Sequence, residues 1–148
     1  MKIEGSYTIP ARREKVYALL LDPAVLKRAI PGCEEIQPQG DAAFRIKMRA
    51  GLASIRGNVE GEIRMEDARP SEHYRLVMSG KGMGSFVNGW ANIDFTEAAG
   101  NTEIRYEGEA AVGGMIAAVG NRMIELAVRK SLSDFFDTFA TETQRHRE

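Results

Sequence analysis

The residues that could most readily bind a ligand through their types and spacing are the glycines and the lysine of SGKGMGS, residues 79–85. Backbone amides of a glycine-rich loop can cradle phosphate, which would make this a nucleotide-binding protein. The spacing excludes that chemistry, because a P-loop needs four residues between its first glycine and the Gly-Lys-Ser/Thr. The three glycines instead recur at every second residue, and the following FVNGWANIDF alternates as a strand does. They therefore share one face of an extended chain.

Side chains capable of acid–base, nucleophilic or metal chemistry are scattered along the sequence. His73 precedes a predicted strand, His146 lies in the polar tail, and Cys33 has no histidine near it in the sequence. General acid–base catalysis requires a group of tuned pKa in the site, and a metal site requires clustered ligands. The glutamates of the predicted strands alternate outward opposite arginines, as in a solvated ladder; they are Glu60, Glu62, Glu103, Glu107 and Glu109. We therefore expect no catalytic residue, no metal site and no covalent or metal-bound cofactor.

Composition and charge exclude several further classes of protein. The chain has 148 residues, a net charge of -1 and 43% hydrophobic residues, which is the balance of one ordinary globular domain spanning residues 1–148. The near-neutral charge predicts no nucleic-acid partner. A single cysteine excludes an intrachain disulfide, and no apolar run is long enough for a membrane span or a secretory signal. A cytoplasmic location is the simplest expectation.

The elements that position these residues follow from the hydrophobic periodicity. KIEGSYTIP alternates as a first strand, and ARREKVYALLLDP and AVLKRAI have the spacing of two short helices. About six more strands follow, and a long helix is predicted over roughly residues 114–143. Its apolar stripe consists of Ile116, Val119, Met123, Ala127, Leu132, Phe135, Phe136 and Phe139. Because this stripe must pack on something apolar, we expect an α+β fold in which the C-terminal helix lies on the apolar face of an antiparallel sheet of about seven strands.

Glycines are unusually frequent on the apolar face of the predicted strands. The glycines in phase with the apolar residues are Gly57, Gly61, Gly80, Gly82, Gly89 and Gly108. Each weakens its strand, so the set needs a reason. The glycines either let the sheet bend and the helix approach, or keep side chains out of a hollow between sheet and helix. Methionines on the same surface suit gap filling or an adaptable binding surface equally well. We favour a ligand-sized cavity over a filled core.

The residues predicted to line this cavity face the space between the sheet and the long helix. They are Phe44, Ile46, Met48, Val59, Gly61, Ile63, Leu76, Met78, Gly80, Val87, Ala91, Ile93, Tyr106, Ile116, Val119, Gly120, Met123 and Ala127. Candidates for polar contact at its mouth are Asn88, Asn92, Tyr106 and Asn121. Asn88 and Asn92 are the weaker candidates, because they share the outer face with Trp90. Trp90 itself is either a partner-docking residue or a side chain covered by a loop.

Three segments carry a resemblance to a known family. Residues 11–36, ARREKVYALLLDPAVLKRAIPGCEEI, contain an L-x-D-P…IPGCE core, and GKGMGSFVNGWANIDF and VGGMIAAVGNRMIELAVRKSLSDFF follow later. They resemble the N-terminal signature, glycine-rich hairpin and terminal helix of the CoxG family, named for the G subunit of carbon monoxide dehydrogenase. That family belongs to the START-like, SRPBCC superfamily. The resemblance covers nearly the whole chain and implies a helix-grip fold, in which the curved sheet and the C-terminal helix enclose a hydrophobic cavity.

The resemblance also implies a function. It implies a non-catalytic accessory protein of a molybdenum hydroxylase of the CO dehydrogenase type, with a quinone- or lipid-like molecule in the cavity. Such a protein would be peripheral to the inner face of the membrane. Because the closing ATETQRHRE is polar, we expect membrane contact to be transient and without an anchor. Two alternatives stay open: an assembly or docking subunit with an incidental cavity, and an enzyme, since START-like folds also host cyclases and hydrolases.

Overall fold

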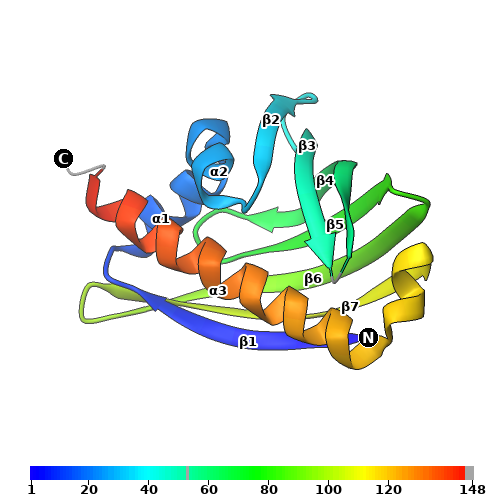
Figure 1. Ribbon diagram of the computed structural model, residues 1–148. Coiled ribbons are helices and arrows are strands. Elements are labelled where there is room, and N and C mark those ends of the chain that lie inside the picture. Colours follow the sequence, from blue (N-terminus) through cyan, green and yellow to red (C-terminus); the bar gives the residue numbers. More distant parts are fainter. Residues whose placement is uncertain (53, 146–148) are drawn as a thin grey trace.

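The computed structural model describes residues 1–52 and 54–145, which form one antiparallel sheet, three α-helices and a 3₁₀ segment (Figure 1). In chain order the elements are β1 (Lys2–Ile9), α1 (Arg13–Leu20), α2 (Pro23–Ala29), β2 (Cys33–Pro38), β3 (Ala43–Leu52), β4 (Ile55–Arg69), β5 (His73–Gly82), β6 (Ser85–Ala98), β7 (Asn101–Gly114), η1 (Met115–Val119) and α3 (Asn121–Arg145). The seven strands are ordered β1-β7-β6-β5-β4-β3-β2. The α+β architecture predicted from the sequence is confirmed.

Along each strand, successive side chains alternate between an inner face of the sheet, which points toward α3, and an outer face. Along β4 the side chains are alternately half-buried and exposed from Ile55 to Met65, and the exposed ones are mostly charged. Strand register places Ile46, Gly61, Gly80 and Val87 in one row across β3 to β6. The two-residue period read from the sequence therefore assigns side chains to the correct face of the sheet.

Several inner-face glycines follow a diagonal across the sheet. From β4 to β1 the diagonal consists of Gly61, Gly80, Gly89, Gly108 and Gly5. A Cβ atom added at Gly108 would lie 1.9 Å from the carbonyl oxygen of Trp90, so the close approach of the neighbouring backbone excludes a side chain there. At Gly80 an added Cβ would meet Val87 Cγ1 at 3.3 Å, an approach that a small adjustment can relieve. The close approach of the neighbouring strand therefore requires a glycine at position 108. At position 80 a small side chain could be accommodated, so Gly80 leaves that part of the inner face without a side chain.

The buried core occupies one end of the sheet, which we call the closed end. Here α1, α2 and the second half of α3 cover the inner face (Figure 1). Val16 and Phe139 are fully buried, and Tyr17 packs edge-on against Tyr74 and Phe95. A smaller cluster under α2 contains Leu26, Phe44 and Ile46. The core is therefore built where three helical segments meet the sheet.

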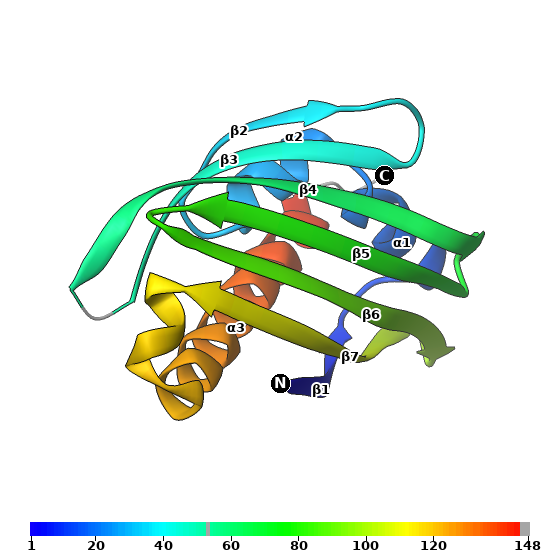
Figure 2. The same cartoon turned by 90° about the vertical axis from the view of Figure 1, so that its right-hand side faces the viewer.

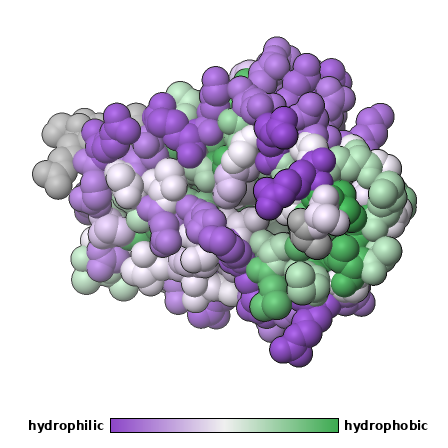
Figure 3. Space-filling view, viewed as in Figure 1, coloured by the Kyte–Doolittle hydropathy of each residue, from purple (hydrophilic) through white to green (hydrophobic). Residues whose placement is uncertain are grey.

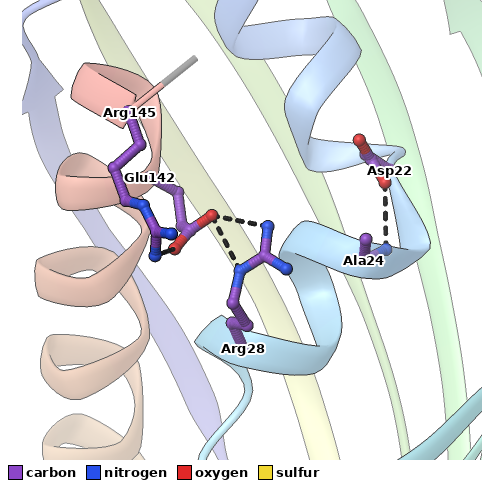
Figure 4. A network of polar contacts seen from close by, with 5 residues as sticks. All are labelled: Asp22, Ala24, Arg28, Glu142 and Arg145. Carbon is purple, nitrogen blue, oxygen red and sulfur yellow. Dashed lines mark hydrogen bonds and ion pairs between the residues drawn. The ribbon is translucent and has the colours of Figure 1, made fainter.

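A buried carboxylate fastens α2 to the end of α3 (Figure 4). The Glu142 side chain is 3% exposed and accepts hydrogen bonds from Arg28 Nε at 2.9 Å and from Arg145 Nη1 at 3.4 Å. Its hydrogen bond raises the pKa of the Arg28 guanidinium. Asp22 caps α2 by accepting from the backbone amide of Ala24 at 2.9 Å. Both ends of α2 are therefore fixed by polar contacts.

The long helix begins later than the sequence predicts. Periodicity places its start at about residue 114, but β7 runs to Gly114, η1 follows, and α3 begins at Asn121. Gly114 and Gly120 have φ values of +79° and +95°, which glycine adopts without the steric cost of a Cβ and which interrupt the helix. As a result Ile124 is buried, whereas Met123 is 45% exposed, so the predicted stripe is out of phase there. Among the described residues, no helix is long and apolar enough to cross a membrane.

Candidate functional site

The candidate site is an apolar surface at the other end of the sheet, which we call the open end. The β3–β4 and β5–β6 hairpins, η1 and the first turns of α3 lie together there (Figure 2). The middle of α3 packs beside β1, where Val128 and Leu132 lie near the start of the chain. On β4, β5 and β6 the inner-face residues Val59, Met78 and Val87 are only partly buried. The inner face of these strands is therefore apolar and still partly accessible.

The structure divides the predicted cavity residues into two groups. Some of them help fill the closed end: Phe44 and Ile46 are buried, and Met48, Ile63, Leu76, Ile93 and Tyr106 pack against the core clusters. The others lie on the partly exposed inner surface or beside it: Val59, Gly61, Met78, Gly80, Val87, Ala91, Ile116, Val119, Gly120, Met123 and Ala127. This second group defines the candidate site.

Two hollows among the described residues lie outside this apolar surface. The larger, of about 750 Å³, is on the outer face across β4 to β7 and includes Arg75, Trp90 and Glu109. The smaller, of about 20 Å³, lies between β1 and α3, where Tyr106 contributes to its wall. The predicted cavity between sheet and long helix stays a prediction. On the inner face at the open end, Val59, Met78 and Val87 are only partly buried.

An aromatic stack fills the space between α3 and the β1–β7 side of the sheet. Tyr7 stacks on Phe136 with ring centroids 4.2 Å apart, and Tyr106 lies on Phe136 at 6.2 Å. Burial raises the pKa of the Tyr106 phenol. An added Cβ at Gly5 would lie 2.5 Å from the Tyr106 hydroxyl, so the ring crosses that glycine. Tyr106 therefore borders the filled part of the sheet rather than the open surface.

The predicted polar contacts at the mouth separate in the same way. Asn88 is exposed in the outer hollow and Asn92 is half-buried on the outer face, as their phase predicts. Asn121, at the start of α3, remains at the open end. The guanidinium of Arg75 lies 4.4 Å above the ring of Trp90, an arrangement typical of a cation–π contact. Trp90 is therefore covered by an arginine within the outer hollow.

The histidine and cysteine side chains that could do chemistry, His73 and Cys33, make polar contacts away from the candidate site. His73 Nδ1 lies 2.8 Å from Asp94, and Cys33 Sγ lies 3.7 Å from the carbonyl oxygen of Glu35. Burial raises the pKa of the Cys33 thiol. Within residues 1–52 and 54–145 no group of three or more His, Cys, Asp or Glu side chains could hold a metal ion. His146 lies outside the described residues.

Large exposed hydrophobic side chains surround the open end, and sequence reasoning missed most of them. Phe86, Met115, Met123 and Leu126 are 45–59% exposed. We call these four residues, together with η1, the apolar tip. Phe86 carried a signal in the sequence, because it is an aromatic residue at an outer, otherwise polar position of β6. Figure 3 shows hydrophobic surface gathered over η1 and the first turns of α3.

Known proteins share the sequence pattern and the fold. The family model for CoxG, the G subunit of carbon monoxide dehydrogenase, matches residues 5–144. The crystal structure of a conserved protein from Geobacillus kaustophilus has 30% sequence identity and a TM-score of 0.93, with 100% of this chain and 98% of that chain covered. No curated protein matches the sequence.

More distant structures show the fold. A START superfamily protein from Mycobacterium smegmatis has 10% identity and a TM-score of 0.73 over 99% of each chain. Zhui aromatase/cyclase from Streptomyces sp. R1128 has 15% identity and a TM-score of 0.70, with 98% of this chain and 94% of that chain covered. The START-like, helix-grip fold implied by the sequence is confirmed, and the chain belongs to the CoxG family.

Proposed function

We propose that this protein is a non-catalytic binding protein that holds a quinone- or lipid-like molecule on the inner face of its open end. The observation that best supports this function is the partial exposure of an apolar sheet surface. Gly80 and Val87 lie side by side in the row across β5 and β6, and Val59 lies within 4 Å of the Cβ position of Gly80. Ala127 of α3 is also only partly buried. An elongated apolar molecule could complete the packing that this surface lacks.

The energetics of such binding favour a carrier that collects its ligand at a membrane. Burying roughly 400 Å² of apolar ligand surface contributes on the order of 10 kcal/mol relative to water. Association costs of about 4–15 kcal/mol offset much of that gain. Relative to a bilayer the apolar contribution is small, because lipid tails are as apolar as the protein surface. Transfer therefore requires contact with the membrane or polar contacts to the ligand head group, for which Asn121 is placed at the open end.

The partner in this proposal is a molybdenum hydroxylase of the CO dehydrogenase type. The name of the family supports this assignment, since it describes a subunit of carbon monoxide dehydrogenase. The protein would supply or remove the apolar molecule, while the enzyme would carry out the chemistry. A protein that only holds and transfers the molecule needs no catalytic group of its own.

Solvent extraction of the purified protein followed by mass spectrometry tests the binding function. Val87→Glu places a charge on the inner surface, and Asn88→Glu places the same charge on the outer face one residue later. We expect a quinone or lipid in extracts of the unmodified protein and of Asn88→Glu, and its loss from Val87→Glu. Equal ligand content in both variants would show that the inner surface is not the binding site.

A second function, docking to a partner enzyme, is favoured by the outer hollow around Trp90. The hollow includes Trp90 and Arg75, and tryptophan and arginine are residue types enriched at the energetic centres of protein interfaces. Under this alternative, Trp90→Ala abolishes co-purification with the hydroxylase, while Val87→Glu leaves it unchanged. The opposite pattern would assign the association to the open end.

A further inference from the structure

The outer face of the sheet is divided into a basic half and an acidic half. The first consists of the neighbouring strands β2 to β5, and the second consists of β6, β7 and β1 (Figure 2). The charged outer side chains in register on the first half are Glu35, Arg45, Lys47, Arg49, Arg56, Glu60, Glu62, Arg64, Glu66, Arg69, Arg75 and Lys81. Those on the second half are Lys2, Glu4, Asp94, Glu103, Arg105, Glu107 and Glu109. Cations outnumber carboxylates on the first half by eight to four, or by eight to six when Glu34 and Asp67 in the bulges are added, and carboxylates outnumber cations on the second by five to two. The face therefore carries a charge dipole across its strands.

Each half contains like charges that the chain itself leaves unpaired. Arg45 and Arg49 lie on the outer face of β3, and Glu4, Glu107 and Glu109 lie together on β1 and β7. Among the described residues, none of these five side chains forms an ion pair. Glu4 and Glu107 are directly opposite each other in the strand register, an arrangement that destabilises a sheet. Contact with opposite charge from another molecule would remove this repulsion.

An exposed aromatic ring and a hollow lie on this same face. Phe86 of β6 is 51% exposed, and its ring lies over Gly113 of β7, where an added Cβ would be 2.1 Å from Phe86 Cζ. The outer hollow begins two residues farther along β6, at Asn88, and Trp90 and Val77 contribute to its wall. An interface between two identical copies uses such a pair twice, because each copy supplies both the ring and the hollow.

We propose that two copies of this chain form a two-fold symmetric dimer through their outer faces. A two-fold axis near Asn88 would place the basic half of each copy opposite the acidic half of the other, and each Phe86 ring at the other copy's hollow. A different protein would have to carry the reverse dipole, whereas a second copy supplies it by symmetry. The six strands from β3 to β1 lie about 4.8 Å apart and are about 10 residues long, so they present roughly 800 Å². That is about the area that each partner buries in a stable interface.

Analytical ultracentrifugation of the purified protein tests this dimer. We expect a dimer at low ionic strength whose dissociation constant rises with salt, because exposed charges are screened. Arg45→Glu and Glu107→Arg should each weaken the dimer by about tenfold or more, since symmetry repeats each repulsive contact. An equimolar mixture of these two variants should recover the affinity of the unmodified protein. In the mixed dimer the two reversed charges face each other, and the second contact is unchanged.

Arg122→Glu is the matched control, because it makes the same charge change on the exposed first turn of α3, away from the outer face. It should leave the dissociation constant within about twofold of the unmodified value. Phe86→Ser removes the ring without a change of charge and should weaken the dimer by about tenfold. Circular dichroism checks that each variant is folded, and Glu107→Arg removes the repulsion with Glu4. A monomer at about 100 µM protein and low salt, equal dissociation constants for Arg45→Glu and Arg122→Glu, or no recovery in the mixture would overturn the proposal.

The hydroxylase is the competing occupant of the outer hollow. If it docks there while the free protein stays monomeric, and Trp90→Ala abolishes the association, the proposal is overturned. The inner face and α3 take no part in the dimer, so the dimer does not depend on the proposed function. Arg45→Glu should dimerise poorly and still retain its ligand in solvent extraction. An empty extract from a dimeric protein would reject the carrier function and leave the dimer supported.

Discussion

The closed and open ends of the sheet use the same residue alternation for different purposes. At the closed end, α1, α2 and the phenylalanine-rich half of α3 convert the inner face into a core with fully buried side chains. At the open end, α3 begins with Met123 and Leu126 exposed, and the strands beside it keep partly accessible apolar residues. The comparison shows that strand periodicity selects the face of the sheet, while the covering helices decide whether that face becomes buried core or stays partly accessible.

The largest expected difference between the ends concerns truncation of a core aromatic residue. Phe139 is 0% exposed, and Phe139→Ala should lower the free energy of unfolding by about 3–5 kcal/mol, because it leaves a cavity among packed rings. Urea denaturation followed by circular dichroism measures the change. A loss of less than about 1 kcal/mol would show that the closed end is not the stabilising core.

An intermediate effect is expected from the carboxylate that joins α2 and α3. Glu142→Gln keeps the shape of the side chain but removes its charge, so it should lower the free energy of unfolding by about 1.5–3 kcal/mol. Asp134→Asn is the matched control, since Asp134 pairs with Lys130 on the exposed side of the same helix. The control should cost about 0–1 kcal/mol in the same denaturation assay. Equal losses would mean that Glu142 adds no special stability to the closed end.

The smallest stability effect is expected at the open end. Leu126 is 55% exposed, so Leu126→Ala should change the free energy of unfolding by no more than about 0.5 kcal/mol. Leu20→Ala removes the same side chain from the closed end, where Leu20 is 7% exposed, and should cost about 2–5 kcal/mol. Comparable destabilisation by both variants would break the distinction between the two ends.

The fold could be predicted because each strand carries its own two-residue pattern. The faces assigned to Ile46, Val59 and Val87 from that pattern are those found in the structure. The resemblance of residues 11–36 and of the terminal helix to the CoxG family added the curved sheet and the position of that helix. The two-residue pattern was sufficient to assign the faces of the strands, and the resemblance was sufficient to place the helix.

The candidate site could be predicted only in part, because its openness depends on the path of α3. Periodicity gave Phe44 and Val59 the same role, although Phe44 is buried in the cluster under α2 and Val59 is only half-buried. The break at Gly120 shifted the exposed stripe of the helix from its predicted phase. Glu142 lies in a polar segment, where the sequence contains no sign that its carboxylate becomes buried against α2.

The contacts between α2 and the end of α3 give the helix a pivot. α3 has 25 residues, so it is about 37 Å long from end to end. A tilt of about 5° around the Arg28–Glu142 contact would move the first turn by about 3 Å, which is comparable to the thickness of a flat ring system. Gly120, with a φ of +95°, precedes the other end of the helix. A tilt around this contact would therefore displace the first turns of α3 more than the phenylalanine-rich half that lies beside the contact.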